Sequence, residues 1–274
     1  MGKASKIVIY GKGGIGKSMI AGNLSILYAK RGLKVLQIGC DPKHDSTRQV
    51  LGRGGKISTV MDVVSGKDLS SVAKEDIVFK GARNVDCIEC GGPKPGVGCA
   101  GRGISLMFEI LGNTGIIERG KYDVVIFDAL GDVVCGGFAA PLRAGFADKA
   151  FIVISEELAS LYAANNITQA VTHYAYNGIY LGGLILNLRD NGADVKHVYN
   201  FAGKLNTRIL ARIPRSEEIT AAEHLNKTAA QEYPVSDITR VFSSLADNIL
   251  SCGRKDTGKL RHIEEDRLRA ILKG

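Results

Sequence analysis

One segment of the chain has residue types and spacing with an evident chemistry. Residues 11–18 read GKGGIGKS and fit the pattern G-x-x-x-x-G-K-[ST], which is typical of loops that bind nucleotide phosphates. Glycines let successive backbone N–H groups point at one phosphate, and the N-terminus of a following helix adds a favourable potential. We expect Lys17 to reach the β- and γ-phosphates and Ser18 to place its hydroxyl on Mg²⁺. The segment predicts a site for ATP and Mg²⁺ made by Gly11, Lys12, Gly13, Gly14, Ile15, Gly16, Lys17 and Ser18.

Two acidic loops follow apolar runs of the kind that form buried strands. Asp41 and Asp45 lie in residues 40–46, and Asp128 begins residues 128–132. We expect Asp128 to help organise Mg²⁺, and Asp41 or Asp45 to orient the attacking water. Each aspartate taken alone also fits the cap of a helix. Their shared position at strand ends favours the nucleotide site.

Two cysteines lie among glycines, where the backbone can approach a metal cluster closely. Cys99 lies in GVGCAGRG and Cys135 in DVVCGGF. Hydrogen bonds from such backbone N–H groups to sulfur tune an iron–sulfur cluster. A [4Fe–4S] cluster needs four thiolates, so two loops with one cysteine each would serve it only in a twofold dimer that shares one cluster.

A rival set of cysteines has the spacing of a metal site within one chain. Cys87 and Cys90 form a C-x-x-C pair, and Cys99 follows. A zinc site would need a fourth ligand, and no further Cys or His lies suitably near. Spacing alone leaves both arrangements open. We interpret Cys40 and Cys252 as small apolar residues of the core.

The elements that must position these residues are short apolar strands alternating with helices. Runs that are apolar on both faces are typical of parallel strands buried beneath helices. Their alternation predicts a single doubly wound, mostly parallel α/β sheet. We expect a helix over residues 17–30 and strands over residues 7–10, 35–38, 124–127, 150–154, 184–188 and 209–213. The loops that follow parallel strands share one edge of the sheet, where the predicted site should lie.

The domain organisation follows from the same alternation. Residues 1–254 are expected to form one P-loop ATPase and iron–sulfur domain, within which residues 52–103 are the least regular. Residues 255–274 are highly charged and carry a weak helical stripe of leucines and isoleucines. We expect a helical C-terminal extension that lies on its own or a neighbouring subunit, with a membrane-surface helix as the alternative.

Composition excludes several other classes of protein. The chain has 274 residues, a formal net charge of +8 and no tryptophan. No Lys/Arg run of five or more is present, so we expect no nucleic-acid partner. No run of about 18 uncharged apolar residues occurs, so no membrane-spanning helix is expected, and we expect no membrane partner. The cysteines of a chain this long, without a secretory signal, predict a cytoplasmic protein with reactive or metal-bound thiols rather than disulfides.

Together, the motifs resemble those of one family, the nitrogenase iron protein and its relatives, which are the ATP-dependent reductase components of nitrogenase-like enzymes. The resemblance runs from residue 7 to about residue 187, and more weakly to about residue 250. It implies a P-loop NTPase fold of the deviant Walker A (SIMIBI) type. It depends on the phosphate loop with its extra Lys12 and on the motifs GCDPKHDS (39–46), GGPKPGVGCAGRG (91–103), DALGDVVCGGFAAP (128–141) and YAANNI (162–167).

The resemblance assigns roles to individual residues. It implies that Cys99 and Cys135 ligate one [4Fe–4S] cluster at a dimer interface, and that Lys12 reaches the other subunit's nucleotide. Arg102 matches an arginine that is ADP-ribosylated in some relatives and would face the docking partner. The remaining matches are Asp41, Lys43 and Asp45 in a first switch, Asp128 and Asp132 in a second switch, and Asn187 and Pro214 near the adenine. The residues expected to act on ATP are Lys12, Lys17, Asp41, Asp45 and Asp132.

The second switch supplies a physical link between the two cofactors. Asp128 and Cys135 are seven positions apart in one loop. A change in the contacts of the γ-phosphate is therefore expected to move a ligand of the cluster directly.

The resemblance implies an ATP-hydrolysing homodimer that receives electrons from a ferredoxin or flavodoxin and passes them singly to a separate catalytic component. Met19, His44, Cys90 and the basic net charge depart from the nitrogenase branch. We therefore expect a nitrogenase-like system that reduces a tetrapyrrole or a carbon–sulfur bond, as a methylthio-alkane reductase does. The alternatives are nitrogenase reductase for dinitrogen fixation and, in another class, a MinD/ParA-like positioning ATPase, which needs neither Cys99 nor Cys135. An iron–sulfur scaffold ATPase would typically show a C-terminal C-x-x-C, and Cys252 stands alone.

Overall fold

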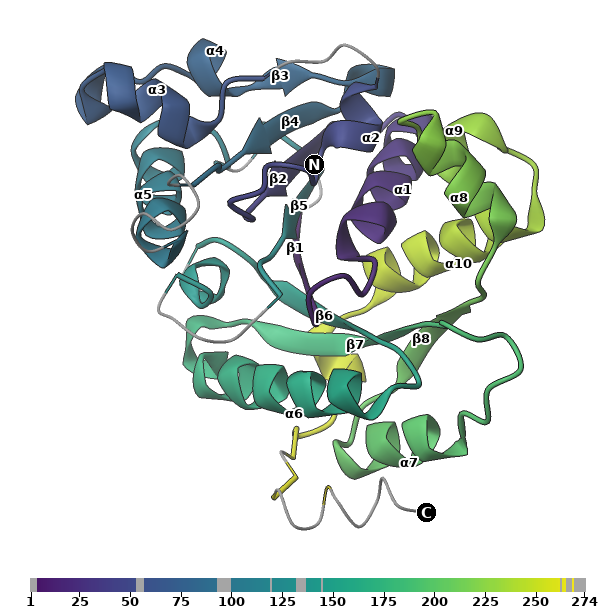
Figure 1. Cartoon of the computed structure of the whole chain (residues 1–274). Coiled ribbons are helices and arrows are strands. Elements are labelled where there is room, and N and C mark those ends of the chain that lie inside the picture. Colours follow the sequence, from purple (N-terminus) through teal and green to yellow (C-terminus); the bar gives the residue numbers. More distant parts are fainter. Residues whose placement is uncertain are drawn as a thin grey trace.

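A single eight-stranded sheet forms the centre of the protein (Figure 1). The computed structural model describes residues 4–52, 57–92, 100–118, 120–131, 137–143, 145–261, 263–264 and 268. The strands are β1 (Ser5–Tyr10), β2 (Val35–Gly39), β3 (Phe79–Lys80), β4 (Asp86–Glu89), β5 (Val124–Asp128), β6 (Lys149–Ile154), β7 (Tyr180–Asn187) and β8 (Ile209–Ile213). Their order is β3-β4-β2-β5-β1-β6-β7-β8. Every pair is parallel except β3 with β4, so the predicted mostly parallel α/β sheet is confirmed.

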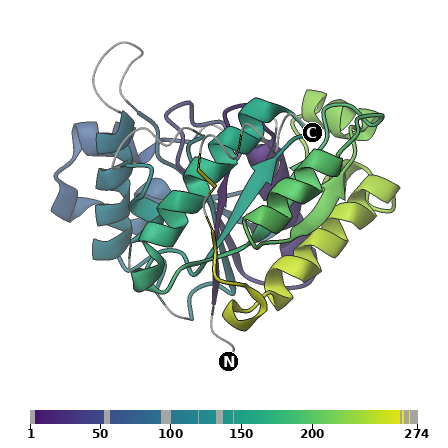
Figure 2. The ribbon, with the colours of Figure 1, turned by 90° about the horizontal axis from the view of Figure 1, so that it is seen from below.

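Helices cover both faces of the sheet, as its two apolar faces require. The helices of the described residues are α1 (Lys17–Lys30), α2 (Arg48–Leu51), α3 (Val60–Gly66), α4 (Lys74–Ile77), α5 (Ala100–Asn113), α6 (Leu158–His173), α7 (Lys196–Lys204), α8 (Glu217–His224), α9 (Ala229–Glu232) and α10 (Asp237–Ser251). One core packs α1 and α10 against the sheet, and the other packs α5, α6 and α7 against its opposite face. Figure 2 shows α6 and α7 across the side seen from below.

Strand β1 lies in the middle of the sheet and determines where a ligand can bind. It pairs with β5 on one side and with β6 on the other. In open α/β sheets, ligands bind outside the carboxyl ends of the strands where the strand order changes direction. The chain leaves β1 at Tyr10 and enters the phosphate loop directly, so this loop lies at that edge.

The region expected to be least regular contains short elements that the apolar pattern did not indicate. Strand β3 has only two residues, and β4 carries Asp86 and Glu89, which are polar yet buried. Each carboxylate has its own partner, since Tyr122 donates its hydroxyl to Asp86 (2.6 Å) and Thr47 donates to Glu89. Buried polar groups are tolerated when they are hydrogen-bonded, which explains a strand without a clear apolar signature.

The described part of the C-terminal extension packs on the same core. Asn165 of α6 forms two hydrogen bonds with the backbone of Ile263, at 2.7 and 2.9 Å. Ile263 and Leu268 are buried in the core beneath α6, and the yellow segment crosses this helix in Figure 2. Residues 257–261 and 263–264 are irregular, so the predicted helix does not extend over them, and for the part of 255–274 that the structure does not describe it stays a prediction.

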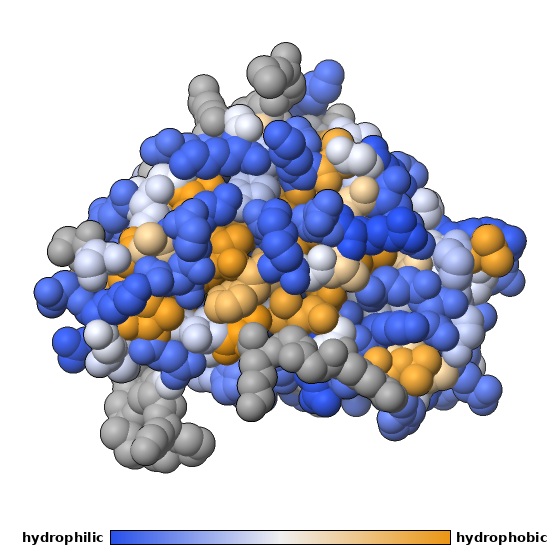
Figure 3. Space-filling view, turned by 90° about the horizontal axis from the view of Figure 1, so that it is seen from above, coloured by the Kyte–Doolittle hydropathy of each residue, from blue (hydrophilic) through white to orange (hydrophobic). Residues whose placement is uncertain are grey.

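The surface mixes hydrophilic and apolar side chains. Seen from above, apolar groups near the centre of the face are interrupted by hydrophilic ones (Figure 3). In the described part of the chain, no helix combines the length and the apolar character needed to cross a membrane.

Candidate functional site

The loop between β1 and α1 adopts a backbone that requires glycine at two positions. Gly11 has φ +145°, and a Cβ there would lie 2.4 Å from the carbonyl oxygen of Val153 on β6. Gly16 has φ +101°, and a Cβ there would lie 2.5 Å from Nδ2 of Asn187 on β7. Both positions exclude side chains by conformation and by space. The loop therefore packs against the neighbouring strands while its other side opens to a pocket.

The N-terminus of α1 is arranged to receive an anion. Gly16 is its N-cap, no side chain caps the helix, and its first turn contains no acidic residue. The first N–H groups of a helix carry a partial positive charge and need partners from outside the helix. Lys17 is buried and donates from Nζ to the carbonyls of Gly11 (3.0 Å) and Lys12 (3.2 Å). The loop thus concentrates donors and a cation at one point, as phosphate binding needs.

Asp128 ends β5 beside this cradle and fits a role in holding Mg²⁺. It is 3% exposed, and its Oδ1 is buried without a hydrogen-bond partner among the described residues. Burial raises the pKa of this carboxyl, while the Lys17 charge and hydrogen bonds from Ser18 and Ser46 oppose the rise. A buried carboxylate oxygen without a donor is costly unless a cation or water completes it. Asp128 and Ser18 therefore provide hard oxygen ligands where the phosphates would end.

An open pocket of about 420 Å³ joins the phosphate loop to the loop after β2. The predicted residues that line it are Gly13, Gly14, Gly16, Lys17, Ser18, Asp41, Lys43, Asp45 and Asp128. These residues come from the ends of three strands that are far apart in sequence. The expected convergence of the phosphate loop and the two acidic loops is therefore found in the structure.

Other predicted nucleotide residues lie close by without lining this pocket. Asn187 supports the loop from β7 by donating to the carbonyl of Ile15 (2.8 Å). Pro214 follows the end of β8 and is half-buried. Lys12 is half-buried and is not among the residues that line the pocket.

Several lining residues were not among the predicted site residues. They are Met19, Arg48, Gln49, Ala129, Glu223 and Asn226. Glu223 and Asn226 lie at the end of α8 and just beyond it, and Gln49 donates to Glu223 (3.1 Å) across the pocket. No motif marks these two positions. Asn226 has φ +52°, a backbone conformation that asparagine tolerates better than most residues.

Buried side chains of the sheet hold the loop after β2 from below. Gln37 of β2 donates from Nε2 to the carbonyl oxygen of Ser46 (2.9 Å). Glu89 at the end of β4 accepts from the backbone N–H and the hydroxyl of Thr47, the latter at 2.8 Å. Gly39 pairs with Glu89 on one side and with Asp128 on the other, so the two carboxylates flank a residue without a side chain.

Glu89 carries an unusual pKa for a carboxylic acid. It is 1% exposed, and its Oε2 has no hydrogen-bond partner within the described ranges. Burial raises the pKa of Glu89 to about 8; the hydrogen bonds from Thr47 oppose this, and the charges of Asp128 and Asp45 add to it. Sequence reasoning did not identify this residue because its importance arises from burial, which the strand pattern does not show.

The loop after β5 touches both the phosphate loop and the start of α5. A Cβ on Gly131 would lie 2.5 Å from the backbone nitrogen of Gly13. A Cβ on Gly137 would lie 2.4 Å from Cα of Gly101. Gly101 and Gly137 each follow a predicted cluster ligand by two residues. Their backbones meet at a distance that only glycine permits, which fits the close approach expected around a cluster.

The predicted cluster ligands Cys99 and Cys135, and the second-switch residue Asp132, lie outside the described residues. Arg102 is exposed on α5 and lines a separate groove with Arg143 and Phe146. The cluster assignment thus depends on the sequence motifs and on the packing of Gly101 against Gly137.

The rival metal site at Cys87 and Cys90 is wrong. Both thiols are fully buried, but Cys87 belongs to the core beneath α1 and Cys90 to the core beneath α5. Strand side chains three positions apart point to opposite faces, so this pair cannot share a metal. In the described part of the chain, no group of three or more His, Cys, Asp or Glu side chains is placed to hold a metal ion.

Comparison with known proteins places these features in one family. A family model described as "4Fe-4S iron sulfur cluster binding proteins, NifH/frxC family" matches residues 5–274. The chain is 45% identical over 249 residues to the nitrogenase iron protein of Methanospirillum hungatei JF-1, covering 90% of this chain and 88% of that protein. It is 44% identical over 245 residues to the nitrogenase iron protein of Methanococcus voltae, covering 89% and 87% of the two chains.

Solved structures share the fold at much lower identity. The septum site-determining protein MinD from Pyrococcus horikoshii OT3, complexed with Mg-ADP, superposes with a TM-score of 0.71 at 22% identity. The match covers 90% of this chain and 96% of that one. This likeness concerns the fold alone.

Proposed function

This chain belongs to the NifH/frxC family of 4Fe–4S iron–sulfur cluster binding proteins, and on that premise we propose how its residues couple ATP to electron transfer. Members of the family bind a [4Fe–4S] cluster and MgATP, and the chain is an ATP-hydrolysing oxidoreductase component. Membership implies a homodimer that acts with a separate catalytic component. The cluster supplies a one-electron couple, and the protein determines when it is used.

At the nucleotide, we propose that Lys17 moves from the loop carbonyls that it now contacts to the β- and γ-phosphates. Its two hydrogen bonds to Gly11 and Lys12 satisfy the ammonium until a phosphate replaces them. Ser18 and Asp128 hold Mg²⁺, and Asp41 or Asp45 orients water toward the γ-phosphate. The uncapped N-terminus of α1 stabilises the charge on the phosphates.

One observation supports the coupling more than any other, namely the two contacts of the loop after β5. Gly131 meets the phosphate loop at Gly13, and Gly137 meets Gly101 at the start of α5. A displacement of the phosphate loop is therefore passed to the segments that follow Cys135 and Cys99. In our proposal these cysteines hold the cluster between two subunits, and Asp132 and Lys12 act at the nucleotides of the dimer.

The partners follow from the same arrangement. Arg102 lies in the first turn of α5, next to Gly101, and is exposed, which suits a docking contact with the catalytic component. A ferredoxin or flavodoxin supplies the electrons in our proposal. Asn187, at the end of β7, and Pro214, directly after β8, flank the adenine in our proposal.

For the final substrate we propose a nitrogenase-like system that reduces a tetrapyrrole or a carbon–sulfur bond. Support comes from the departures of Met19, His44 and Cys90 from the nitrogenase pattern and from the net charge of +8. Dinitrogen reduction is the second candidate, because relatives 45% and 44% identical to this chain are named nitrogenase iron protein.

The test is capture of the catalytic component while hydrolysis is arrested. Tagged protein is incubated anaerobically with lysate of its own source, MgADP and aluminium fluoride, and the retained protein is identified and assayed. We expect a nitrogenase-like partner whose capture is lost in Arg102→Ala and kept in Arg240→Ala, an exposed arginine of α10. A partner that forms ammonia from dinitrogen with this reductase would select the second candidate. Capture that Arg102→Ala leaves intact would contradict the docking role.

A further inference from the structure

Tyr10 connects the strand that leads into the phosphate loop with the loop after β5. None of the roles proposed above includes this contact. Tyr10 is the last residue of β1, directly before the phosphate loop, and it is fully buried. Its hydroxyl donates to the carbonyl oxygen of Phe138 at 3.0 Å, across 128 positions of sequence. The two rings also pack together, with centroids 4.5 Å apart and an interplanar angle of 36°. Burial holds the pKa of Tyr10 well above its usual value, so the hydroxyl remains a donor.

Phe138 lies on the returning arm of the loop that follows β5. It comes three positions after Cys135 and one after Gly137, whose backbone packs on Gly101. The outgoing arm of the same loop packs on the phosphate loop through Gly131 and Gly13. The unit formed by β1 and the phosphate loop therefore contacts this loop on both arms. The Gly131 contact is steric, whereas Tyr10 adds a directional hydrogen bond on the arm that bears the predicted cluster ligand.

We propose that Tyr10 is a positioning residue that ties the cluster-bearing arm to the phosphate loop, so that nucleotide binding changes the environment of the cluster through the hydrogen bond from its hydroxyl to the Phe138 carbonyl. This inference rests on the proposed function. Tyr10 is not among the residues that line the nucleotide pocket, so its removal should leave nucleotide affinity intact. Its effect is instead on the transmission of the bound state to the cluster.

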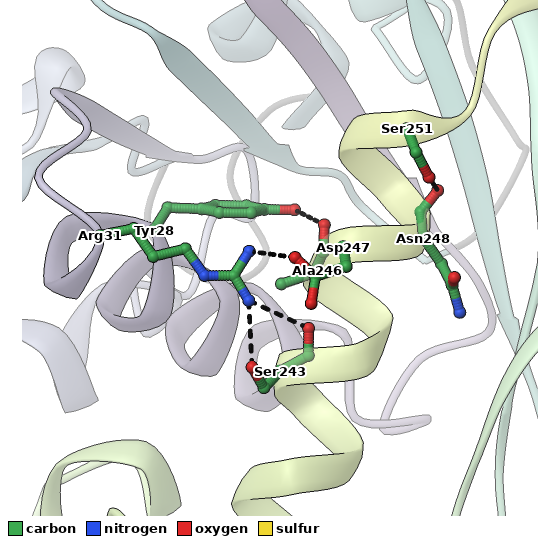
Figure 4. Close-up of polar contacts among 7 residues, drawn as sticks. All are labelled: Tyr28, Arg31, Ser243, Ala246, Asp247, Asn248 and Ser251. Atoms are coloured by element: carbon green, nitrogen blue, oxygen red, sulfur yellow. Dashed lines mark hydrogen bonds and ion pairs between the residues drawn. The ribbon is translucent and has the colours of Figure 1, made fainter.

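Tyr28 provides a matched control within the same chain. It is also fully buried, and its hydroxyl donates to a backbone carbonyl, that of Ala246, at 3.1 Å. Figure 4 shows this contact between α1 and α10, beside Arg31 and its partners Ser243 and Asp247. Replacing either tyrosine by phenylalanine removes one buried hydroxyl and its hydrogen bond to a backbone carbonyl. Only the Tyr10 change affects a contact with the loop after β5.

The experiment measures the midpoint potential of the cluster with and without MgADP in anaerobic wild-type protein, Tyr10→Phe and Tyr28→Phe. We expect wild type and Tyr28→Phe to show the same nucleotide-induced shift, and Tyr10→Phe to lose at least about half of it. The Kd for MgADP should stay within about twofold in all three proteins, because no pocket residue is changed. If Tyr10→Phe does not fold, Tyr10→Met replaces the ring by a smaller, flexible apolar side chain that also lacks the hydroxyl, and it carries the same expectation.

The outcomes separate the inference from the function on which it depends. A full nucleotide-induced shift in the Tyr10 variant would overturn the inference while leaving the proposed function intact. Loss of MgADP binding in that variant would overturn it as well, because Tyr10 would then act in binding. Wild-type protein without a cluster would contradict the proposed function itself.

Discussion

Lys17 and Asp128 place opposite charges at the end of the phosphate pocket. Both are buried, with 8% and 3% of their surface exposed, so neither charge is fully hydrated. A buried charge is stable only with a partner, and each gains one from the other and from the loop. Bound phosphate and Mg²⁺ would replace these contacts with stronger ones. The pair is therefore arranged for a ligand rather than for the stability of the empty loop.

Replacing Lys17 by alanine should abolish ATP hydrolysis. The variant loses the cation that neutralises charge on the transferred phosphoryl group, and we expect turnover to fall by about 100-fold or more. Phosphate release is the measurement. Lys67→Ala removes an exposed lysine of a surface ion pair and serves as the control, with unchanged turnover expected. Hydrolysis at the wild-type rate in Lys17→Ala would refute the role of the loop.

Glu89 should make stability depend on pH. Its pKa of about 8 in the folded protein lies above its ordinary value of 4.5, so the folded state keeps the proton longer. Between these two values the folded state binds more protons than the unfolded state, and the free energy of unfolding falls as the pH rises. Glu89→Gln has no such titration. The loss of stability between pH 5 and pH 8 should therefore be smaller in this variant, by up to about 1.4 kcal/mol for each pH unit.

Urea unfolding at both pH values provides this comparison. The control is Glu75→Gln, which removes an exposed carboxylate from α4 and should keep the wild-type slope. An identical pH dependence in wild type and Glu89→Gln would show that Glu89 is ionised in the fold, contrary to the pKa inferred from its burial.

At the scale of elements, the decisive feature is the packing of one loop on another. The loop after β5 approaches the phosphate loop so closely that a methyl group at Gly131 would meet the backbone of Gly13. Backbone on both sides leaves no flexible side chain to move aside. Two loops packed this closely offer a direct contact through which a shift of one can reach the other, which is the property that coupling requires.

Gly131→Ala should disturb this coupling at its first contact. The added Cβ must displace the phosphate loop, so we expect MgADP to bind about tenfold or more weakly. Gly112→Ala is the control, because a Cβ there meets nothing within 4 Å on the exposed side of α5. Alanine is favoured over glycine in a helix by up to about 1 kcal/mol, so this control should unfold at a slightly higher temperature. It should bind MgADP normally. Isothermal titration calorimetry and thermal unfolding test both variants.

Sequence reasoning was most successful where a local pattern determines a local structure. The helix over residues 17–30 and the strand over residues 209–213 match α1 and β8, because apolar runs and the phosphate motif define both. Asp128 was placed at a strand end, which is confirmed by β5. The meeting of Asp128 and the phosphate loop in one pocket was predicted from the rule that parallel strands end at a common edge of the sheet.

Sequence reasoning failed where the outcome depends on contacts between distant residues. The C-x-x-C spacing of Cys87 and Cys90 left a rival metal site open, but the two thiols lie in the cores on opposite faces of the sheet. The burial of Glu89 and the contact of Tyr10 with Phe138 depend on which strands become neighbours. Asn165 binds the backbone of Ile263 from 98 positions away, a contact that no local motif announces.

At the scale of the whole molecule, one subunit lines the nucleotide pocket described above and carries two of the four thiolates that the predicted cluster needs. The pocket is made by residues of a single chain. In our proposal Cys99 and Cys135 supply two thiolates to a cluster that needs four, so a second copy would complete it. Dimerisation is therefore part of the chemistry. The two predicted cluster ligands distinguish this chain from MinD, which resembles it in fold alone.

The most direct test of this account is the iron content of the dimer, measured with its visible absorbance after strictly anaerobic purification. We predict about four irons per dimer and a brown colour that bleaches on one-electron reduction. Cys135→Ala should be free of iron yet bind MgADP normally, and Cys252→Ala, which changes a buried cysteine of the core, should keep its iron. Colourless, iron-free wild-type protein would contradict the account.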